Sequence, residues 1–104
     1  MVQKKIYLDR NAREELRNFP EKVQIDFEAY FDILKREGML EYPYSKKIGK
    51  NLFEIRVKYK GEYRGFYTYL AKEYILILHF FQKKSRKTPI NNIKTAKRRL
   101  KNYE

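Results

Sequence analysis

The chain has 104 residues, with 25 Lys and Arg against 13 Asp and Glu, and so carries a formal net charge of +12. This length allows a single domain, residues 1–104, and a hydrophobic content of 42% with ten Tyr and seven Phe excludes a disordered chain. The absence of cysteine excludes disulfides, thiolate metal sites and a cysteine nucleophile. The positive charge favours a nucleic acid, an anionic membrane surface or an acidic protein as partner, and a lysine-rich solubilising surface is the alternative.

The sequence contains no targeting or membrane signal. Residues 1–6 become charged too early for a signal peptide, and no apolar run approaches the length of a membrane span. The absence of cysteine suits a reducing compartment. We therefore expect a soluble, cytoplasmic protein with no membrane partner.

In the first half of the chain, a strand precedes two helices. Residues 3–8 read as a short strand, and Asp9 is a good N-cap for the helix that follows. Pro20 suits the first position of a second helix, and Gly38 provides its end. Apolar residues at helical spacing predict a helical hairpin with one apolar stripe. They are Ala12, Leu16, Phe19, Val23, Phe27, Tyr30 and Leu34.

In the second half, the apolar spacing changes to two after a polar connection, residues 39–51, which we expect on the surface. Residues 52–57, 63–70 and 74–81 predict three strands joined by short turns, an antiparallel meander. A last helix starts at Pro89, with an apolar seam of Ile90, Ile93, Ala96, Leu100 and Tyr103. The order β-α-α-β-β-β-α predicts an α+β fold, in which a small antiparallel sheet packs against the N-terminal hairpin and a C-terminal helix follows.

Two arginines on neighbouring predicted strands are the first candidate site. Arg56 occupies the polar phase of its strand beside Glu54, and Arg64 lies among aromatic residues on the next strand. A hairpin could bring both guanidiniums to one patch, where they could hold a phosphate bidentately. The alternative is a solvated strand face with a Glu54–Arg56 pair that contributes little.

A cationic cluster follows the last predicted strand and is the second candidate site. It consists of Lys83, Lys84, Arg86 and Lys87, and Thr88-Pro89 caps the next helix. Positive charge held at a fixed place is what recognition of a phosphodiester requires. An ordinary solvated charge run is the alternative, and the pattern is specific for polyanions rather than for catalysis.

His79 and the tyrosines are weaker candidates. His79 is the single histidine, and its strand phase is that of Ile75 and Ile77, which indicates packing or a buried hydrogen bond rather than acid–base catalysis. Tyr67, like Tyr63 or Tyr69, could stack on exposed bases. No cluster of Asp, Glu and His has metal-ligand spacing and no glycine-rich phosphate loop occurs, so we expect neither metal nor cofactor. The basic last helix could lie on nucleic acid or simply face water.

Three motifs in one order carry a family resemblance. Residues 52–57 (LFEIRV), 63–67 (YRGFY) and 77–89 (ILHFFQKKSRKTP) follow the patterns L-[YF]-E-[LI]-R, [YF]-R-x-x-Y and H-x-F-x-K-K-[ST]-x-K-T-P. The chain thus closely resembles the HigB-like, phage-related branch of the RelE/ParE toxin superfamily, over about its whole length. Together the ordered motifs are specific, whereas each alone would be weak.

The resemblance implies the toxin of a type II toxin–antitoxin pair, a metal-independent endoribonuclease that cleaves mRNA in the ribosomal A site. The ribose 2′-OH would attack the adjacent phosphate. By motif, Arg56 and Arg64 would bind the scissile phosphate, and Lys83 and Lys84 would take the place of the basic residues after the last strand. Arg86, Lys87 and Thr88 would grip the RNA backbone, and His79 would become a more credible participant. A cognate antitoxin, of helix-turn-helix type, would cover the basic groove.

The sequence also departs from the RelE pattern. RelE carries two lysines on the second strand and a tyrosine beyond the basic cluster, where this chain offers Glu54 and Arg56 and no tyrosine between Lys83 and Lys101. The general base is therefore unassigned. Two alternatives stay open: a ParE-like toxin that acts on DNA gyrase, and a basic module that binds nucleic acid without cleaving it.

Overall fold

The computed structural model describes residues 3–104 as a five-stranded sheet with three α-helices and a short 3-10 helix. The strands are β1 (Lys5–Leu8), β2 (Ser45–Gly49), β3 (Leu52–Lys58), β4 (Glu62–Leu70) and β5 (Tyr74–Lys83). The α-helices are α1 (Arg10–Arg17), α2 (Glu21–Glu37) and α3 (Ile90–Leu100), and the 3-10 helix covers Lys101–Tyr103. The predicted α+β class is confirmed, with one strand more than expected.

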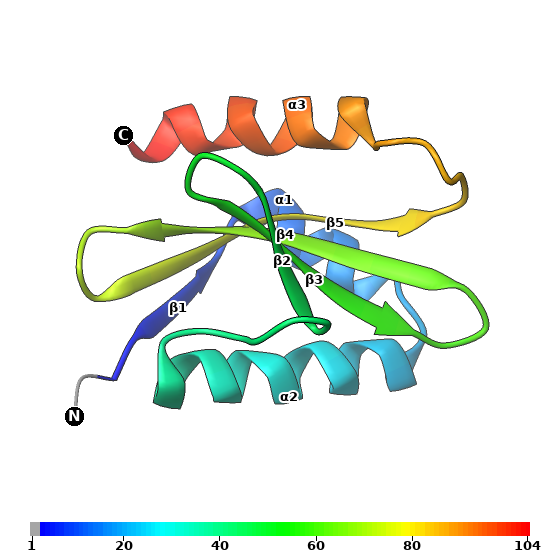
Figure 1. Cartoon of the computed structure of the whole chain (residues 1–104), viewed down its shortest axis with the longest axis horizontal. Helices are drawn as coiled ribbons and strands as arrows, with labels where there is room; N and C mark the ends of the chain where they lie inside the picture. The colour runs from blue at the N-terminus through cyan, green and yellow to red at the C-terminus, as the bar shows by residue number, and fades with distance from the viewer. Residues whose placement is uncertain (1–2) are drawn as a thin grey trace.

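The elements form layers, with the sheet between α2 and α3 (Figure 1). Apolar side chains of α1 and α2 share one core with one face of the sheet: Ala12, Leu16, Val23, Phe27, Phe31, Leu34, Ile55, Val57, Tyr67, Ile75, Ile77 and Phe80 among them. A smaller core lies under α3 on the other face, with Leu52, Phe66, Leu76, Leu78, Phe81 and Ala96. Strands buried on both faces explain the nearly continuous apolar run of β5. No helix within residues 3–104 has the length and apolar character needed to cross a membrane.

The helix ends follow the residues that mark them in the sequence. The Asp9 carboxylate accepts hydrogen bonds from the backbone N–H groups of Asn11 and Ala12, at 2.9 and 3.1 Å, so it caps α1 as predicted. Gly38 ends α2 in the left-handed conformation, with φ of 77°. Pro20 lies one position before the helix rather than at its first position. The first strand likewise starts at Lys5, two residues later than expected.

The prediction that residues 39–51 form a surface connection throughout is wrong, because β2 lies within them. The sheet order is β1-β5-β4-β3-β2, with β1 parallel to β5 and the other neighbours antiparallel. Lys46 and Lys47 pair with Glu54 and Phe53 of β3 and give this edge strand the charge typical of exposed sheet edges. The meander is therefore the centre of a wider, mixed sheet.

A β-bulge in β5 overturns the predicted orientation of His79. Phe66 pairs with His79 and Tyr67 with Ile77, so Leu78 is an extra residue that shifts the register. As a result, His79 leaves the face of Ile75 and Ile77. Its ring stacks on that of Phe81, at a centroid distance of 5.5 Å, on the side of the sheet that α3 covers.

Candidate functional site

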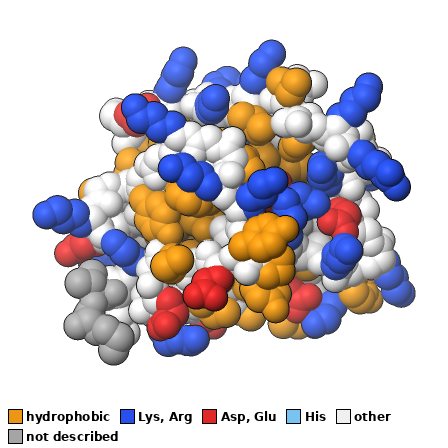
Figure 2. Space-filling view, viewed as in Figure 1, with side chains coloured by type: hydrophobic (Ala, Val, Ile, Leu, Met, Phe, Trp, Pro, Cys, Tyr) orange, Lys and Arg blue, Asp and Glu red, His pale blue; other side chains and the backbone are white. Residues whose placement is uncertain are grey.

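A groove on the α3 side of the sheet collects most of the predicted phosphate-binding residues. Its cavity has a volume of about 470 Å³. We call it the basic groove and define it by its lining residues: Lys46, Lys47, Ile48, Glu54, Arg56, Arg64, Lys83, Arg86, Thr88, Pro89 and Ile93. Six of these are cations and one is an anion. Figure 2 shows Lys and Arg side chains gathered around α3 and the segment after β5, whereas most acidic side chains lie toward α2.

The sheet register explains why residues distant in sequence meet in this groove. Arg56 and Arg64 are direct partners across the antiparallel β3–β4 pair, and so they project from the same face. Lys83 ends β5, opposite Glu62 of β4. The segment after β5 then turns back toward α3 and brings Arg86 and Thr88 to the rim. Thus the predicted hairpin does unite the arginines, and the cationic cluster partly joins them.

Glu54 ties the two arginines together within the groove. Its side chain is only 4% exposed, and its Oε1 lies 2.9 Å from Arg56 Nε and 3.0 Å from Arg64 Nη1. Arg64 Nη2 also donates to Glu62 Oε1 at 2.8 Å, and this hydrogen bond lowers the pKa of Glu62. A carboxylate held by two guanidiniums fixes both in position.

The two arginines differ in how accessible they are. Arg64 is buried, with both terminal nitrogens engaged by carboxylates and its Nε without a hydrogen-bond partner within residues 3–104. The Arg56 side chain is 32% exposed. Of the two arginines, Arg56 therefore presents the larger free surface, and Arg64 lines the groove with its terminal nitrogens held by Glu54 and Glu62. That both guanidiniums hold one phosphate directly stays a prediction.

Four further cations of the groove carry unneutralised charge. Within residues 3–104, Lys46, Lys47, Lys83 and Arg86 have no carboxylate within 4.0 Å. Sequence reasoning missed Lys46 and Lys47 because their segment was taken for a loop. The available signal was the tract Ser45-Lys46-Lys47-Ile48, which places an apolar residue beside two lysines before a glycine.

Lys84 and Lys87, unlike Lys83 and Arg86, do not line the basic groove. Together with Ser85 and Asn92 they line a separate, smaller cavity of about 140 Å³. Lys83, Thr88 and Pro89 line both this cavity and the basic groove. The backbone N–H of Lys87 donates to Ser85 Oγ at 3.1 Å, which closes a tight turn. The cationic cluster is thus divided between two sides of one turn.

His79 belongs to a polar network that holds α3 onto α1 and β5, and it does not line the groove. Its Nδ1 lies 2.9 Å from Glu15 Oε1, and its Nε2 lies 2.7 Å from Asn92 Oδ1. Arg99 of α3 adds two hydrogen bonds to Glu15, at 2.9 and 2.8 Å, and one to the Leu78 carbonyl oxygen. Burial opposes ionisation of Glu15, but the hydrogen bonds from His79, Arg99 and the Phe80 amide prevail and lower its pKa to about 2.

Tyr67 cannot stack on RNA bases, so that prediction is wrong. Its side chain is 1% exposed in the core on the α2 side, its hydroxyl lies 2.7 Å from Ser45 Oγ, and its ring stacks on Phe53. Burial raises the pKa of Tyr67 to about 12. The strand phase of Tyr67 is opposite to that of Arg64 and Phe66, which face α3, and this places it on the other side of the sheet.

Comparison with protein families identifies the family of the chain. A family model described as "Phage derived protein Gp49-like (DUF891)" matches residues 14–101. The chain belongs to this family. The matched range of the Gp49-like protein runs from within α1 through the end of α3 and includes every residue of the basic groove. Among curated protein sequences, no match is found.

Solved structures share the fold of this Gp49-like protein at low sequence identity. A mutant of the E. coli toxin RelE in the free state aligns with a TM-score of 0.72 and 14% identity, covering 96% of this chain and 99% of that one. RelE in the E. coli RelBE toxin–antitoxin complex aligns with a TM-score of 0.65 and 15% identity, covering 81% of this chain and 100% of that one. The archaeal RelE–RelB complex from Pyrococcus horikoshii aligns with a TM-score of 0.61 and 19% identity, covering 83% of this chain and 100% of that one. These matches confirm the predicted RelE-like fold.

Within residues 3–104, no group of three or more His, Asp or Glu side chains is arranged to hold a metal ion. The ionisable groups that line the groove are its six cations and the Glu54 carboxylate. This combination can bind the phosphates of a polyanion and supply one proton acceptor.

Proposed function

We propose that this Gp49-like protein is the toxin of a type II toxin–antitoxin pair and cleaves mRNA on the ribosome. The observation that carries the proposal is the basic groove, which Arg56, Lys83 and Arg86 line together with the buried Glu54 carboxylate. The RelE-like fold supports it, since the structures that share the fold are toxins, two of them bound to RelB antitoxins. The partner would be a cognate antitoxin, and a helix-turn-helix type is expected from the sequence resemblance.

Cleavage needs an attacking group, a place for its proton and stabilisation of the phosphorane. In the proposed reaction the ribose 2′-oxygen bonds to the adjacent phosphorus, and the bond from phosphorus to the 5′-oxygen breaks. The products are a 2′,3′-cyclic phosphate and a 5′-hydroxyl, so the step consumes no water. Arg56, Lys83 and Arg86 would face the charge that develops on the phosphorane.

Glu54 is the proton acceptor that the groove provides. Both arginines approach its Oε1, and its Oε2 makes no hydrogen bond within residues 3–104. An Oε2 free of partners could take the proton of the 2′-OH, while a lysine ammonium could protonate the departing 5′-oxygen. Arg64 would act as a positioning residue, because it holds Glu54 and both of its terminal nitrogens are engaged by carboxylates.

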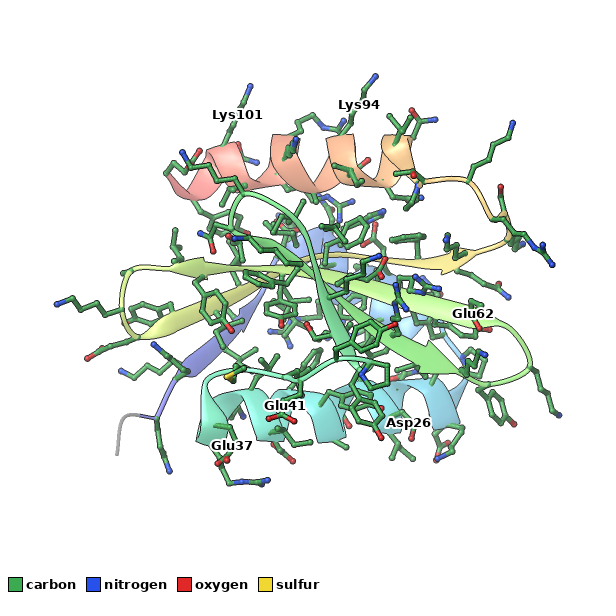
Figure 3. All side chains as sticks on the ribbon, viewed as in Figure 1. Asp26, Glu37, Glu41, Glu62, Lys94 and Lys101 are labelled. Carbon is green, nitrogen blue, oxygen red and sulfur yellow. The ribbon has the colours of Figure 1, made fainter. Side chains whose placement is uncertain are left out.

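The test is primer extension on an mRNA translated in a purified system with and without the protein. Cuts phased with codons, whose 3′ fragments carry 5′-hydroxyl ends, are expected with the wild type. They should disappear with Arg56→Ala and with Glu54→Gln. The matched control, Lys94→Ala with Lys101→Ala, removes two cations that point away from the sheet, one on α3 and one at the start of the 3-10 helix after it (Figure 3), and should cut normally.

The alternatives predict different results in the same experiments. A toxin directed at gyrase would leave transcripts intact and reduce DNA supercoiling in a parallel assay. A binding module without activity would retain the transcript in a gel shift and protect it from added nuclease. Either result would overturn the nuclease proposal.

A further inference from the structure

A second surface lies on the opposite side of the sheet from the basic groove. It surrounds a cavity of about 660 Å³ between the C-terminal half of α2 and the segment that leads into β2. We call it the aromatic–acidic face and define it by its lining residues: Tyr30, Ile33, Glu37, Met39, Leu40, Glu41, Tyr42 and Tyr44. Figure 3 shows its two acidic residues, Glu37 and Glu41, beside α2. Neither the sequence motifs nor the proposed cleavage uses this face.

The segment that carries the face is anchored at both ends. At its start, the Tyr69 hydroxyl donates to the Gly38 carbonyl oxygen at 2.7 Å, and Leu40 is buried. At its end, Ser45 Oγ lies 2.7 Å from the buried Tyr67 hydroxyl. A surface held in this way loses little conformational entropy when it binds a partner.

Between these anchors, large apolar side chains are exposed. Met39 is 55% exposed, Tyr42 73% and Tyr44 53%, and the Tyr44 ring rests on Tyr30 at a centroid distance of 5.7 Å. Tyr and Met are enriched where proteins contact each other, because they bury much area at low entropic cost. Three of the large exposed hydrophobic residues of the chain are thus concentrated at one cavity.

The charge of this face is opposite to that of the whole molecule. Glu37 and Glu41 make no ion pair or side-chain hydrogen bond to any of residues 3–104. The helix α2 also carries Glu21, Asp26, Glu28 and Asp32, whereas α3 contains no acidic residue. In a chain of net charge +12, unpaired carboxylates beside exposed aromatic rings would repel RNA and anionic lipid headgroups and attract cations.

We propose that the aromatic–acidic face docks a segment of a partner protein that carries Lys or Arg on both sides of a large apolar side chain. The apolar side chain would fill the cavity against Tyr42 and Tyr44, and the flanking cations would pair with Glu37 and Glu41. This interaction is independent of the proposed cleavage, because the two surfaces lie on opposite sides of the sheet.

The experiment titrates the full-length ¹⁵N-labelled chain with a blocked peptide, KRFLRK, and follows amide chemical shifts. Two matched peptides, SSFLSS and KRSSRK, remove the charges or the apolar pair. We expect KRFLRK to shift the amides of residues 37–44 in a saturable manner, while each matched peptide binds at least fivefold more weakly. Raised salt should weaken the binding of KRFLRK more than the binding of SSFLSS.

Two neutralised variants separate the face from general charge effects. Glu37→Gln with Glu41→Gln should weaken KRFLRK about fivefold, since two exposed ion pairs are lost. The control, Glu28→Gln with Asp32→Asn, removes two exposed carboxylates elsewhere on α2 and should change the affinity less than twofold. Tyr42→Ala should weaken KRFLRK by about fivefold or more. All variants should cut RNA normally if cleavage occurs at all.

Three results would overturn the proposal. The first is no saturable shift up to 1 mM KRFLRK, and the second is shifts confined to residues outside 37–44. The third is an equal loss of KRFLRK affinity in the Glu37→Gln, Glu41→Gln variant and in the Glu28→Gln, Asp32→Asn control. Sedimentation of the free chain supplies a further check: a dimer that dissociates in the Glu37→Gln, Glu41→Gln variant would assign the face to a second copy instead of a separate partner.

Discussion

The two sides of the sheet present opposite surfaces. On the α3 side, six cations and one buried carboxylate line the basic groove. On the α2 side, exposed tyrosines and a methionine surround two unpaired carboxylates. Both surfaces are made partly by residues flanking or belonging to β2, the strand at the edge of the sheet.

This difference between the two sides lies in how charge is distributed over the molecule, which the net charge alone does not describe. A value of +12 alone suggests a protein that binds polyanions over its whole surface. The fold instead places acids along α2 and leaves α3 without any, so that a polyanion is directed to one side. The opposite side is thereby kept free for a contact of different chemistry.

The largest expected difference between the two sides is in catalysis. Arg56→Ala with Lys83→Ala should lower the single-turnover rate of RNA cleavage by about 100-fold or more, because charge on the phosphorane loses two stabilising cations. Glu37→Gln with Glu41→Gln, on the other side, should leave the rate within about twofold. Rates measured on ribosome-bound mRNA with excess enzyme provide the test. Comparable losses in both variants would remove the distinction between the two surfaces.

The second expected effect is on the stability of the α3 side at low pH. Hydrogen bonds from His79 and Arg99 lower the pKa of Glu15 from 4.5 to about 2, against the effect of burial. Because the folded-state pKa is the lower one, ionised Glu15 stabilises the fold above pH 4.5, and this stabilisation of about 3 kcal/mol is lost as the pH falls toward 2.

Hydrogen exchange between pH 5 and pH 2.5 would measure this effect, after correction for the intrinsic exchange rates. Amides of α3 should lose protection over that range, whereas those of α2, which the Glu15 network does not hold, should change less. The variant Glu15→Gln should start with weaker α3 protection at neutral pH and show a flatter pH profile. A steep profile in Glu15→Gln would contradict the assignment to Glu15.

Strongly periodic features of the structure could be predicted from the sequence. The caps at Asp9 and Gly38, the apolar stripe of the hairpin and the β3–β4 pair follow directly from local residue patterns. The same β3–β4 register brings Arg56 and Arg64 together. These features depend on residues close in sequence, where spacing alone determines which side chains share a face.

Features that depend on distant residues could not be predicted. The segment containing β2 is rich in Lys and Tyr, and its strand forms because Ser45 bonds to Tyr67 and its backbone pairs with β3. His79 changes face because one extra residue is accommodated against β4. The burial of Arg64 likewise depends on Glu54 and Glu62 from two strands, so its exposure could not be inferred from strand alternation.

A smaller effect, on stability alone, is expected from Tyr67→Phe. It tests whether Tyr67 lies on the sheet face opposite the basic groove. The change removes the hydrogen bond to Ser45 Oγ and should lower the free energy of unfolding by about 1–2 kcal/mol, since Ser45 is also buried. RNA affinity of the folded protein should stay the same. Urea unfolding and filter binding would measure the two quantities, and a loss of RNA affinity without loss of stability would contradict the placement of Tyr67 on the face opposite the groove.

The smallest expected effect is on the salt dependence of RNA binding and tests whether β2 belongs to the basic groove. Lys46→Gln with Lys47→Gln should reduce the slope of log affinity against log salt by about 1.4, because each phosphate contact on a single strand contributes about 0.7. Lys94→Gln with Lys101→Gln changes the net charge equally, but these side chains, on α3 and on the 3-10 helix after it, point away from the sheet (Figure 3). Its slope should match that of the wild type. Equal reductions in the two variants would mean that RNA senses only the overall charge, and the groove would then have no defined path for the strand. A reduction confined to the Lys46 and Lys47 variant would place the RNA backbone along β2, the edge strand of the sheet.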